Sequence, residues 1–224
     1  IRDRSVSRGL GDVYKRQYYI GLAYYDEDGM YKDTKLADYN SNTYYRRYNV
    51  TANLTLNPFR TTEIKLGIQG YLANANYPAS AQATIFESAY FTQPTYIAPL
   101  YPDGKLGAFS GGNLNPVAQL GATGYANQWR SQVYSNLRVT QQLYKGLSIS
   151  GMFSFDTYNY TSNRFTKSPN TYHATGRDAN GNLIYEQTRQ GTENLAYSLS
   201  AKGDRTIYLE AALNYKNTFG RHDV

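Results

Sequence analysis

The chain has 224 residues and contains no cysteine, two histidines and a single tryptophan. The absence of cysteine excludes a disulfide framework, a thiolate zinc site and a cysteine nucleophile. The sequence also lacks any run of about eighteen apolar residues, which is the length that a transmembrane helix needs. A β-barrel that crosses a membrane is compatible with this composition, because only every second residue of its strands has to be apolar.

Basic residues exceed acidic ones, and the formal net charge is +6. Half of that excess lies in residues 1–17, and the remaining charge is spread without clusters. Nucleic-acid binding needs a basic patch, so we expect no nucleic-acid partner. Residues 1–17 follow neither a period-two nor a helical pattern and lack the apolar core of a signal peptide. They resemble translated sequencing-adaptor sequence, with a basic tail as the alternative, and we set them apart from residues 18–224.

Stretches that alternate apolar and polar residues predict β-strands. The clearest one has an apolar side formed by Tyr48, Val50, Ala52, Leu54 and Leu56, and a polar side formed by Asn49, Thr51, Asn53, Thr55 and Asn57. Successive side chains of a strand point to opposite faces, so this strand has one apolar and one polar face. Five further stretches follow a similar pattern: 18–25, 63–72, 132–143, 147–156 and 206–215. Such strands suit a wall between hydrocarbon and a watery lumen.

The aromatic residues are mostly tyrosine, with 25 Tyr against 8 Phe. Tyrosine has an apolar ring and a polar hydroxyl, which fits both the membrane–water boundary and sugar-binding surfaces. A soluble β-protein is the alternative, because tyrosine also favours strands in general.

The connections between the predicted strands alternate between short and long. Tight turns are expected at residues 57–61, 144–146 and 219–223, after the second, fourth and sixth strands. Long connections follow the first, third and fifth strands. An antiparallel meander then has all short turns at one end, as outer-membrane barrels do, whereas a sandwich would distribute its loops more evenly. Six strands cannot close such a barrel, so we expect residues 18–224 to be a fragment of a larger one.

The long connections contain local structure signals. In residues 73–130, Ser80 is a candidate N-cap of a short alanine-rich helix that Pro94 would end, and residues 101–105 predict a β-turn. In the later connection, Asn180-Gly181 predicts a hairpin between residues 171–177 and 182–186.

Polar clusters that could bind metal have simpler explanations. Asp26, Glu27 and Asp28 lack a calcium-ligand spacing and read as a solvated turn that stops the first strand. Asp178, Asn180 and Asn182 are explained by the hairpin. Neither His173 nor His222 has a catalytic partner at a recognised spacing. We therefore assign no catalytic, cofactor-binding or metal-binding residue and expect no enzymatic activity.

Aromatic residues of the first long loop could stack on sugars or dock a lid protein: Tyr90, Phe91, Tyr96, Tyr101 and Trp129. For Trp129 we favour the role of an anchor at the membrane interface, at the foot of the loop. No substrate-binding residue is identified.

Several segments together resemble the barrel region of SusC/RagA-type TonB-dependent outer-membrane transporters of Gram-negative bacteria. The matching segments are residues 21–29, 48–54, 101–105, 115–120, 208–215 and 218–224. The resemblance implies a multi-pass barrel of about 22 strands in outer-membrane lipid. It also implies a plug coupled to the TonB complex, and a SusD-like surface lipoprotein with which glycans or peptides are captured. The plug and the TonB box are missing here, so no energy-coupling residue is assigned. The rival hypotheses are a surface adhesin or assembly barrel that transports nothing, and a soluble sugar-binding β-sandwich.

Overall fold

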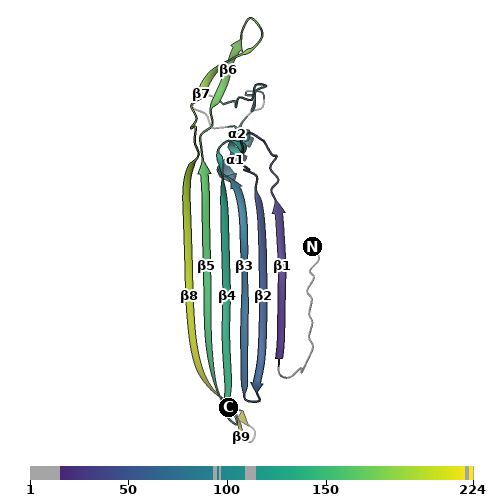
Figure 1. Cartoon of the computed structure of the whole chain (residues 1–224), viewed down its shortest axis with the longest axis vertical. Helices are drawn as coiled ribbons and strands as arrows, with labels where there is room; N and C mark the ends of the chain where they lie inside the picture. The colour runs from purple at the N-terminus through teal and green to yellow at the C-terminus, as the bar shows by residue number, and fades with distance from the viewer. Residues whose placement is uncertain (1–15, 93–94, 96, 109–114, 220–221, 224) are drawn as a thin grey trace.

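A computed structural model describes residues 16–92, 95, 97–108, 115–219 and 222–223. Its main feature is a single antiparallel sheet of six long strands in the order β1-β2-β3-β4-β5-β8 (Figure 1). These strands are β1 (Arg16–Asp28), β2 (Tyr44–Phe59), β3 (Thr62–Pro78), β4 (Gly124–Tyr144), β5 (Leu147–Thr166) and β8 (Ala196–Tyr215). The predicted all-β meander of six strands is confirmed. The sheet is open, with β1 and β8 at its edges, so closure into a barrel is not present in the described residues.

Each strand is longer than its alternating stretch, and most of the added length lies toward the long loops. β4 and β5 have 21 and 20 residues, and they pair without interruption from Gly124↔Thr166 to Gln142↔Ser148. The added part of β5, residues 157–166, is mostly polar and was not included in the predicted strand. Its backbone groups nevertheless continue the ladder. β1 also begins at Arg16, two residues inside the segment set apart above.

The short turns lie at one end of the sheet and the long connections at the other (Figure 1). β2 and β3 are joined by Arg60 and Thr61, and β4 and β5 by Lys145 and Gly146. Gly146 has φ +81°, and a Cβ there would lie 2.3 Å from the carbonyl oxygen of Lys216. This turn therefore requires glycine. The predicted short turns after the second and fourth strands and the long connections after the first, third and fifth are confirmed, while the third predicted turn, at residues 219–223, falls partly outside the described residues.

The cluster expected to stop the first strand does not do so. β1 continues through Asp28, in register with Tyr44 of β2. The reason is that Asp26 finds a cationic partner, Arg46, on the neighbouring strand. The acidic residues are thus accommodated as a cross-strand pair instead of forming a turn.

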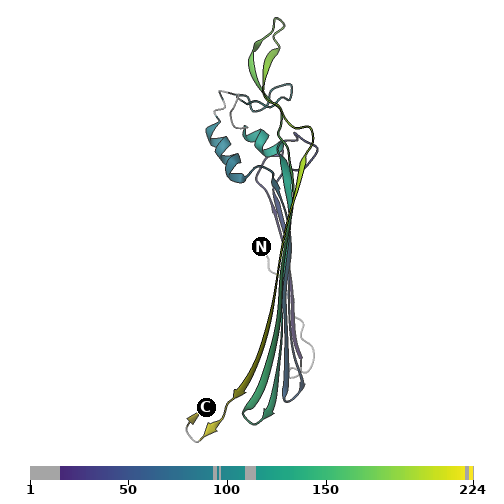
Figure 2. The same ribbon diagram turned by 90° about the vertical axis from the view of Figure 1, so that its left-hand side faces the viewer.

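Two helices, α1 (Gln82–Phe91) and α2 (Pro116–Gly121), lie on one side of the sheet at its loop end (Figure 2). The prediction of a short helix is confirmed, but the predicted N-cap residue, Ser80, is wrong. The N-cap is Ala81, without a side-chain hydrogen bond, while the Ser80 hydroxyl contacts Gln119 and lies 3.0 Å from Thr123 Oγ1. Ser80 joins the two ends of the long loop instead. Pro94, expected to end α1, lies outside the described residues.

The predicted hairpin forms β6 (Thr171–Arg177) and β7 (Leu183–Arg189), and the expected β-turn closes with a 2.9 Å bond from Gly104 N to Tyr101 O. A small apolar core among the loops consists of Leu36, Leu106, Ala118 and Ala122. Beyond β8, β9 (Thr218–Phe219) pairs with β10 (His222–Asp223), and the intervening turn lies outside the described residues. Among the described residues, no helix has the length and apolar character needed to cross a membrane.

Candidate functional site

The register places the apolar residues of all six strands on one face. Val50 of β2 lies opposite Leu22 and Gly70, and the rows continue through β4 and β5 to β8. We call this surface the apolar belt, and its members include Ile20, Leu22, Tyr24, Tyr48, Val50, Leu54, Leu66, Ile68, Leu72, Val133, Leu137, Val139, Phe153, Phe155, Ile207, Leu209 and Leu213.

The apolar belt is exposed to an unusual degree for a folded chain. Its exposed members range from 37% at Ile68 to 76% at Leu22, with Leu209 at 75%, while Leu54, Leu66 and Phe155 are half-buried. The strands pack extensively only against their neighbours within the sheet. No second layer of the described residues covers the belt, as a sandwich would require. An uncovered apolar surface of this kind marks a contact surface.

The edge of the apolar belt toward the loops runs obliquely across the hydrogen-bonded rows. The last apolar residue of the belt is Ile207 in β8, Phe155 in β5, Val133 in β4, Leu72 in β3, Tyr48 in β2 and Tyr24 in β1. Phe155 is level with Ser135, Ile68 and Ala52, whereas the edge in β2 lies four residues further on. From β8 to β1, the edge of the apolar belt therefore shifts by four residues along the strands toward the loops.

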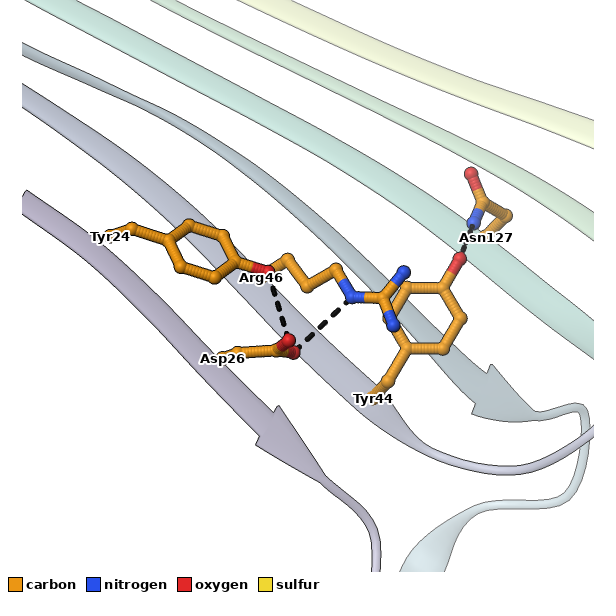
Figure 3. Close-up of polar contacts among 5 residues, drawn as sticks. All are labelled: Tyr24, Asp26, Tyr44, Arg46 and Asn127. Atoms are coloured by element: carbon orange, nitrogen blue, oxygen red, sulfur yellow. Dashed lines mark hydrogen bonds and ion pairs between the residues drawn. The ribbon is translucent and has the colours of Figure 1, made fainter.

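Polar and aromatic side chains border this edge (Figure 3). The Tyr24 hydroxyl donates to Asp26 over 2.9 Å, and Arg46 Nε donates to the same carboxylate over 3.2 Å. The Arg46 guanidinium also lies 5.0 Å from the centre of the Tyr44 ring, a cation–π contact. Trp129 lies on the same face, between Asn74 and Thr161. Trp129 therefore lies within β4, five residues after Gly124, and not in the long loop, while its role as an interface anchor stays a prediction.

The opposite face of the sheet is polar and carries a cavity at its loop end. The cavity has a volume of about 390 Å³ and lies between this face and α1. Glu27, Gln128 and Arg164 contribute polar groups to its wall, while Met30 and Ile85 contribute apolar surface. Arg164 donates a hydrogen bond to the carbonyl of Ala79, which fixes its guanidinium at the rim. A mixed lining of this size suits a small polar molecule with some apolar surface.

A basic side chain sits among aromatic rings in the loops. Lys105 Nζ lies 4.5 Å from the centre of the Tyr185 ring and donates to the Asp103 carboxylate. This hydrogen bond lowers the pKa of Asp103 and raises the pKa of Lys105. Tyr101 is buried beside them, and its hydroxyl accepts a 3.0 Å bond from Ala174 N. These contacts join the β-turn to the β6–β7 hairpin.

The carboxylate of Asp178 organises the tip of that hairpin. Its Oδ1 accepts 2.8 Å bonds from the backbone N–H groups of Asn180 and Asn182, and its Oδ2 accepts a 3.0 Å bond from Asn182 Nδ2. The Asn182 side chain and these backbone donors lower the pKa of Asp178. The three residues thus form a turn, and their oxygen ligands are not arranged around a metal ion.

We expect the hairpin tip to loosen in acid. A lowered folded-state pKa stabilises the turn above the ordinary aspartate value of about 3.9, and that stabilisation is lost as the pH falls through the folded value. Hydrogen exchange protection of the Asn180 and Asn182 amides should therefore decrease in that range. In Asp178→Asn the protection should no longer vary with pH. Protection that stays constant in the unmodified chain down to pH of about 2 would contradict this role.

The other residues considered from sequence are dispersed. His173 in β6 lies opposite Glu186, and His222 lies opposite Phe219 in a separate hairpin. Tyr90 and Phe91 are exposed at the end of α1 with their rings 5.2 Å apart. Tyr96 lies outside the described residues. Within the described residues, no three His, Asp or Glu side chains gather where they could hold a metal ion.

One cluster was missed by the sequence reasoning. Tyr39, Tyr125, Phe165 and Tyr197 come from four segments and form a continuous row of rings. Three of them lie in strand extensions beyond the predicted strands, and they meet through the register of β4, β5 and β8, which the sequence does not show. In comparisons with known proteins, no family model and no curated protein matches the chain.

Proposed function

We propose that the six-stranded sheet is part of the wall of an outer-membrane barrel of the SusC/RagA-type importers, which take up glycans or peptides. The observation that carries this proposal is the oblique, uncovered apolar belt. Its edge rises by four residues, or about 13 Å, across five strand spacings of about 4.8 Å each, which corresponds to a strand tilt of about 30°. Transmembrane barrel strands are tilted by about 35–45°, so a belt level with a membrane has to cross the rows obliquely.

The height of the apolar belt supports the same proposal. In β2 the belt extends from Tyr48 to Leu56, a length of about 27 Å along the strand. At a tilt of about 30° this spans about 23 Å, close to the apolar band of about 25 Å in outer-membrane barrels. Tyr24, Tyr48 and Trp129 border one edge, where barrels carry a girdle of aromatic residues.

The exposed edges of β1 and β8 indicate that more strands are needed. Unpaired backbone groups at a sheet edge cannot be satisfied in hydrocarbon, so both edges have to pair with further strands in a larger barrel. The polar face would then line the lumen, and the cavity beneath α1 would face incoming substrate. The long loops would meet a SusD-like lipoprotein, and a plug would connect the barrel to the TonB complex.

Labelling of paired cysteine variants tests the orientation of the sheet. The chain has no cysteine, so each introduced thiol is unique. In lipid vesicles, Leu54→Cys should react with a polar maleimide at least about tenfold more slowly than Asn53→Cys, because hydrocarbon excludes the reagent. Bromine atoms on mid-chain lipid carbons should quench the fluorescence of Trp129 weakly and the fluorescence of the tryptophan introduced by Leu54→Trp strongly. Equal reactivity of the two thiols in vesicles contradicts the proposal, and protection of Leu54→Cys in lipid-free buffer favours the soluble sandwich.

Uptake separates the importer from an adhesin or assembly barrel. Deleting the gene in its host should abolish accumulation of a labelled oligosaccharide or peptide inside the cell. A deletion that only weakens surface attachment, with unchanged uptake of both probes, would support the adhesin.

A further inference from the structure

A row of four aromatic rings lies on the belt-bearing face, at the loop end of the sheet. The ring centres are 5.4 Å apart for Tyr39 and Tyr125, 4.9 Å for Tyr125 and Phe165, and 5.0 Å for Phe165 and Tyr197. Tyr125, Phe165 and Tyr197 are register partners on three consecutive strands. The aromatic row is therefore a continuous stack of rings across the sheet, with neighbouring ring planes inclined by 23–40°, and Tyr197 is 56% exposed at its end.

A row of amides runs parallel to these rings, one row closer to the apolar belt. Asn76, Asn127 and Asn163 are register partners across β3, β4 and β5, next to Tyr44 of β2. Asn127 Nδ2 donates to the Tyr44 hydroxyl over 3.1 Å (Figure 3), and the Tyr197 hydroxyl donates to Asn163 Oδ1 over 2.8 Å. Each amide has two donor hydrogens and two acceptor lone pairs, so these bonds orient the Asn127 and Asn163 amides and leave capacity for a ligand.

The two rows line one open groove with a volume of about 850 Å³. Its wall consists of five aromatic residues, four asparagines and Asp38. Asp38 is the single charged group among these residues, so an anionic ligand would find no cation there. The exposed ring of Tyr197 at the end of the stack lies beside an oriented amide, and this combination matches a ligand with C–H faces and hydroxyl edges. Neutral pyranose rings have this combination of surfaces.

The position of the groove argues against an interfacial girdle. Along β8, Tyr197 lies ten residues beyond Ile207, the last apolar residue of the belt. This separation is about 33 Å, more than the thickness of the headgroup region that interfacial aromatic residues occupy. The rings must therefore serve a purpose other than anchoring the sheet at the lipid boundary.

We propose that this groove binds neutral sugar residues, which stack on Tyr197 at the exposed end of the aromatic row and bond to the Asn127 and Asn163 amides. The sugar could belong to a free oligosaccharide or to the glycan of a membrane lipid, and the chemistry of recognition is the same. The site is separate from the lumen-side cavity. It does not depend on transport, so its test and the test of the proposed function can fail independently.

Calorimetric titration of the whole chain in detergent provides the test. The probes are maltohexaose, cellohexaose, and lipopolysaccharide with or without its long neutral O-chain. We expect Tyr197→Ala to weaken binding of a recognised probe by about tenfold, a size typical of losing one stacking ring. Tyr197→Phe should keep most of the affinity, since the ring remains. Tyr144→Ala serves as the matched control, because Tyr144 is an exposed tyrosine at the short-turn end of β4, away from the groove.

The outcomes separate the two sources of sugar. Binding of a free hexasaccharide that depends on the Tyr197 ring assigns the groove to soluble oligosaccharides. Binding restricted to lipopolysaccharide with its O-chain, again lost in Tyr197→Ala, assigns it to membrane glycan. The proposal is overturned if no probe binds, or if Tyr197→Ala binds as well as Tyr144→Ala and the unmodified chain while circular dichroism shows an intact sheet.

Discussion

Ile68→Arg is expected to abolish stable insertion of the chain into lipid vesicles. Ile68 lies in the middle of the apolar belt on β3, a central strand of the sheet. An arginine on the lipid face near the midplane costs about 2–4 kcal/mol, which reduces the inserted fraction by a factor of about 30 to 1,000. Flotation of vesicles in a density gradient measures the inserted fraction, and the expected result is a variant that stays at the bottom.

Two further variants make this prediction specific to the belt. Gln69→Arg puts the same charge one residue away on the polar face and should float like the unmodified chain. Tyr48→Arg puts it at the edge of the belt, where the cost falls to about 0–1 kcal/mol. If Ile68→Arg and Gln69→Arg float equally well, the belt does not face lipid.

Asn115→Ala is expected to unfold the first long loop locally. Asn115 is buried, and its Oδ1 accepts a 2.8 Å bond from Ala118 N at the start of α2. Its Nδ2 donates to the carbonyl oxygens of Pro99 and Gly107. Loss of the cap costs about 1 kcal/mol, and leaving the carbonyl of the buried Gly107 without this donor costs about 1–3 kcal/mol, whereas Pro99 O still accepts a bond from Gly107 N. Together these losses should lower the stability of the loop by about 2–4 kcal/mol.

Hydrogen exchange at the Ala118 and Gly107 amides measures this effect. Asn115→Ser should give an intermediate result, because a serine hydroxyl can still cap α2 but cannot reach both carbonyls. The six-stranded sheet should keep its protection in both variants, since its ladder does not involve Asn115. Exchange at Ala118 and Gly107 that is unchanged in Asn115→Ala would show that the loop is held by other contacts.

Much of the sheet could be predicted from the sequence because its signals are local. The alternation around Val50 and Leu54 is a property of adjacent residues, and so are the turn signals at Gly146 and Gly181. Strand ends were harder to predict. β1 continues through Asp26 because this carboxylate pairs with Arg46, twenty positions away on the neighbouring strand. Ser80 likewise bonds to Gln119 and Thr123 at the other end of the long loop. Such partners are distant in the chain, so a local pattern cannot reveal them.

The sequence alone determined which residues form strands, which of their faces is apolar, and at which end the short turns lie. Only the tertiary structure decided which residues of different strands lie at the same height in the sheet. The oblique edge of the apolar belt, the cavity beneath α1 and the meeting of Tyr39 with Tyr125, Phe165 and Tyr197 all depend on it. The physical reason is that each turn and its cross-strand hydrogen bonds set a register between two strands. The relative height of residues several strands apart is the sum of those registers, which no single stretch of sequence contains.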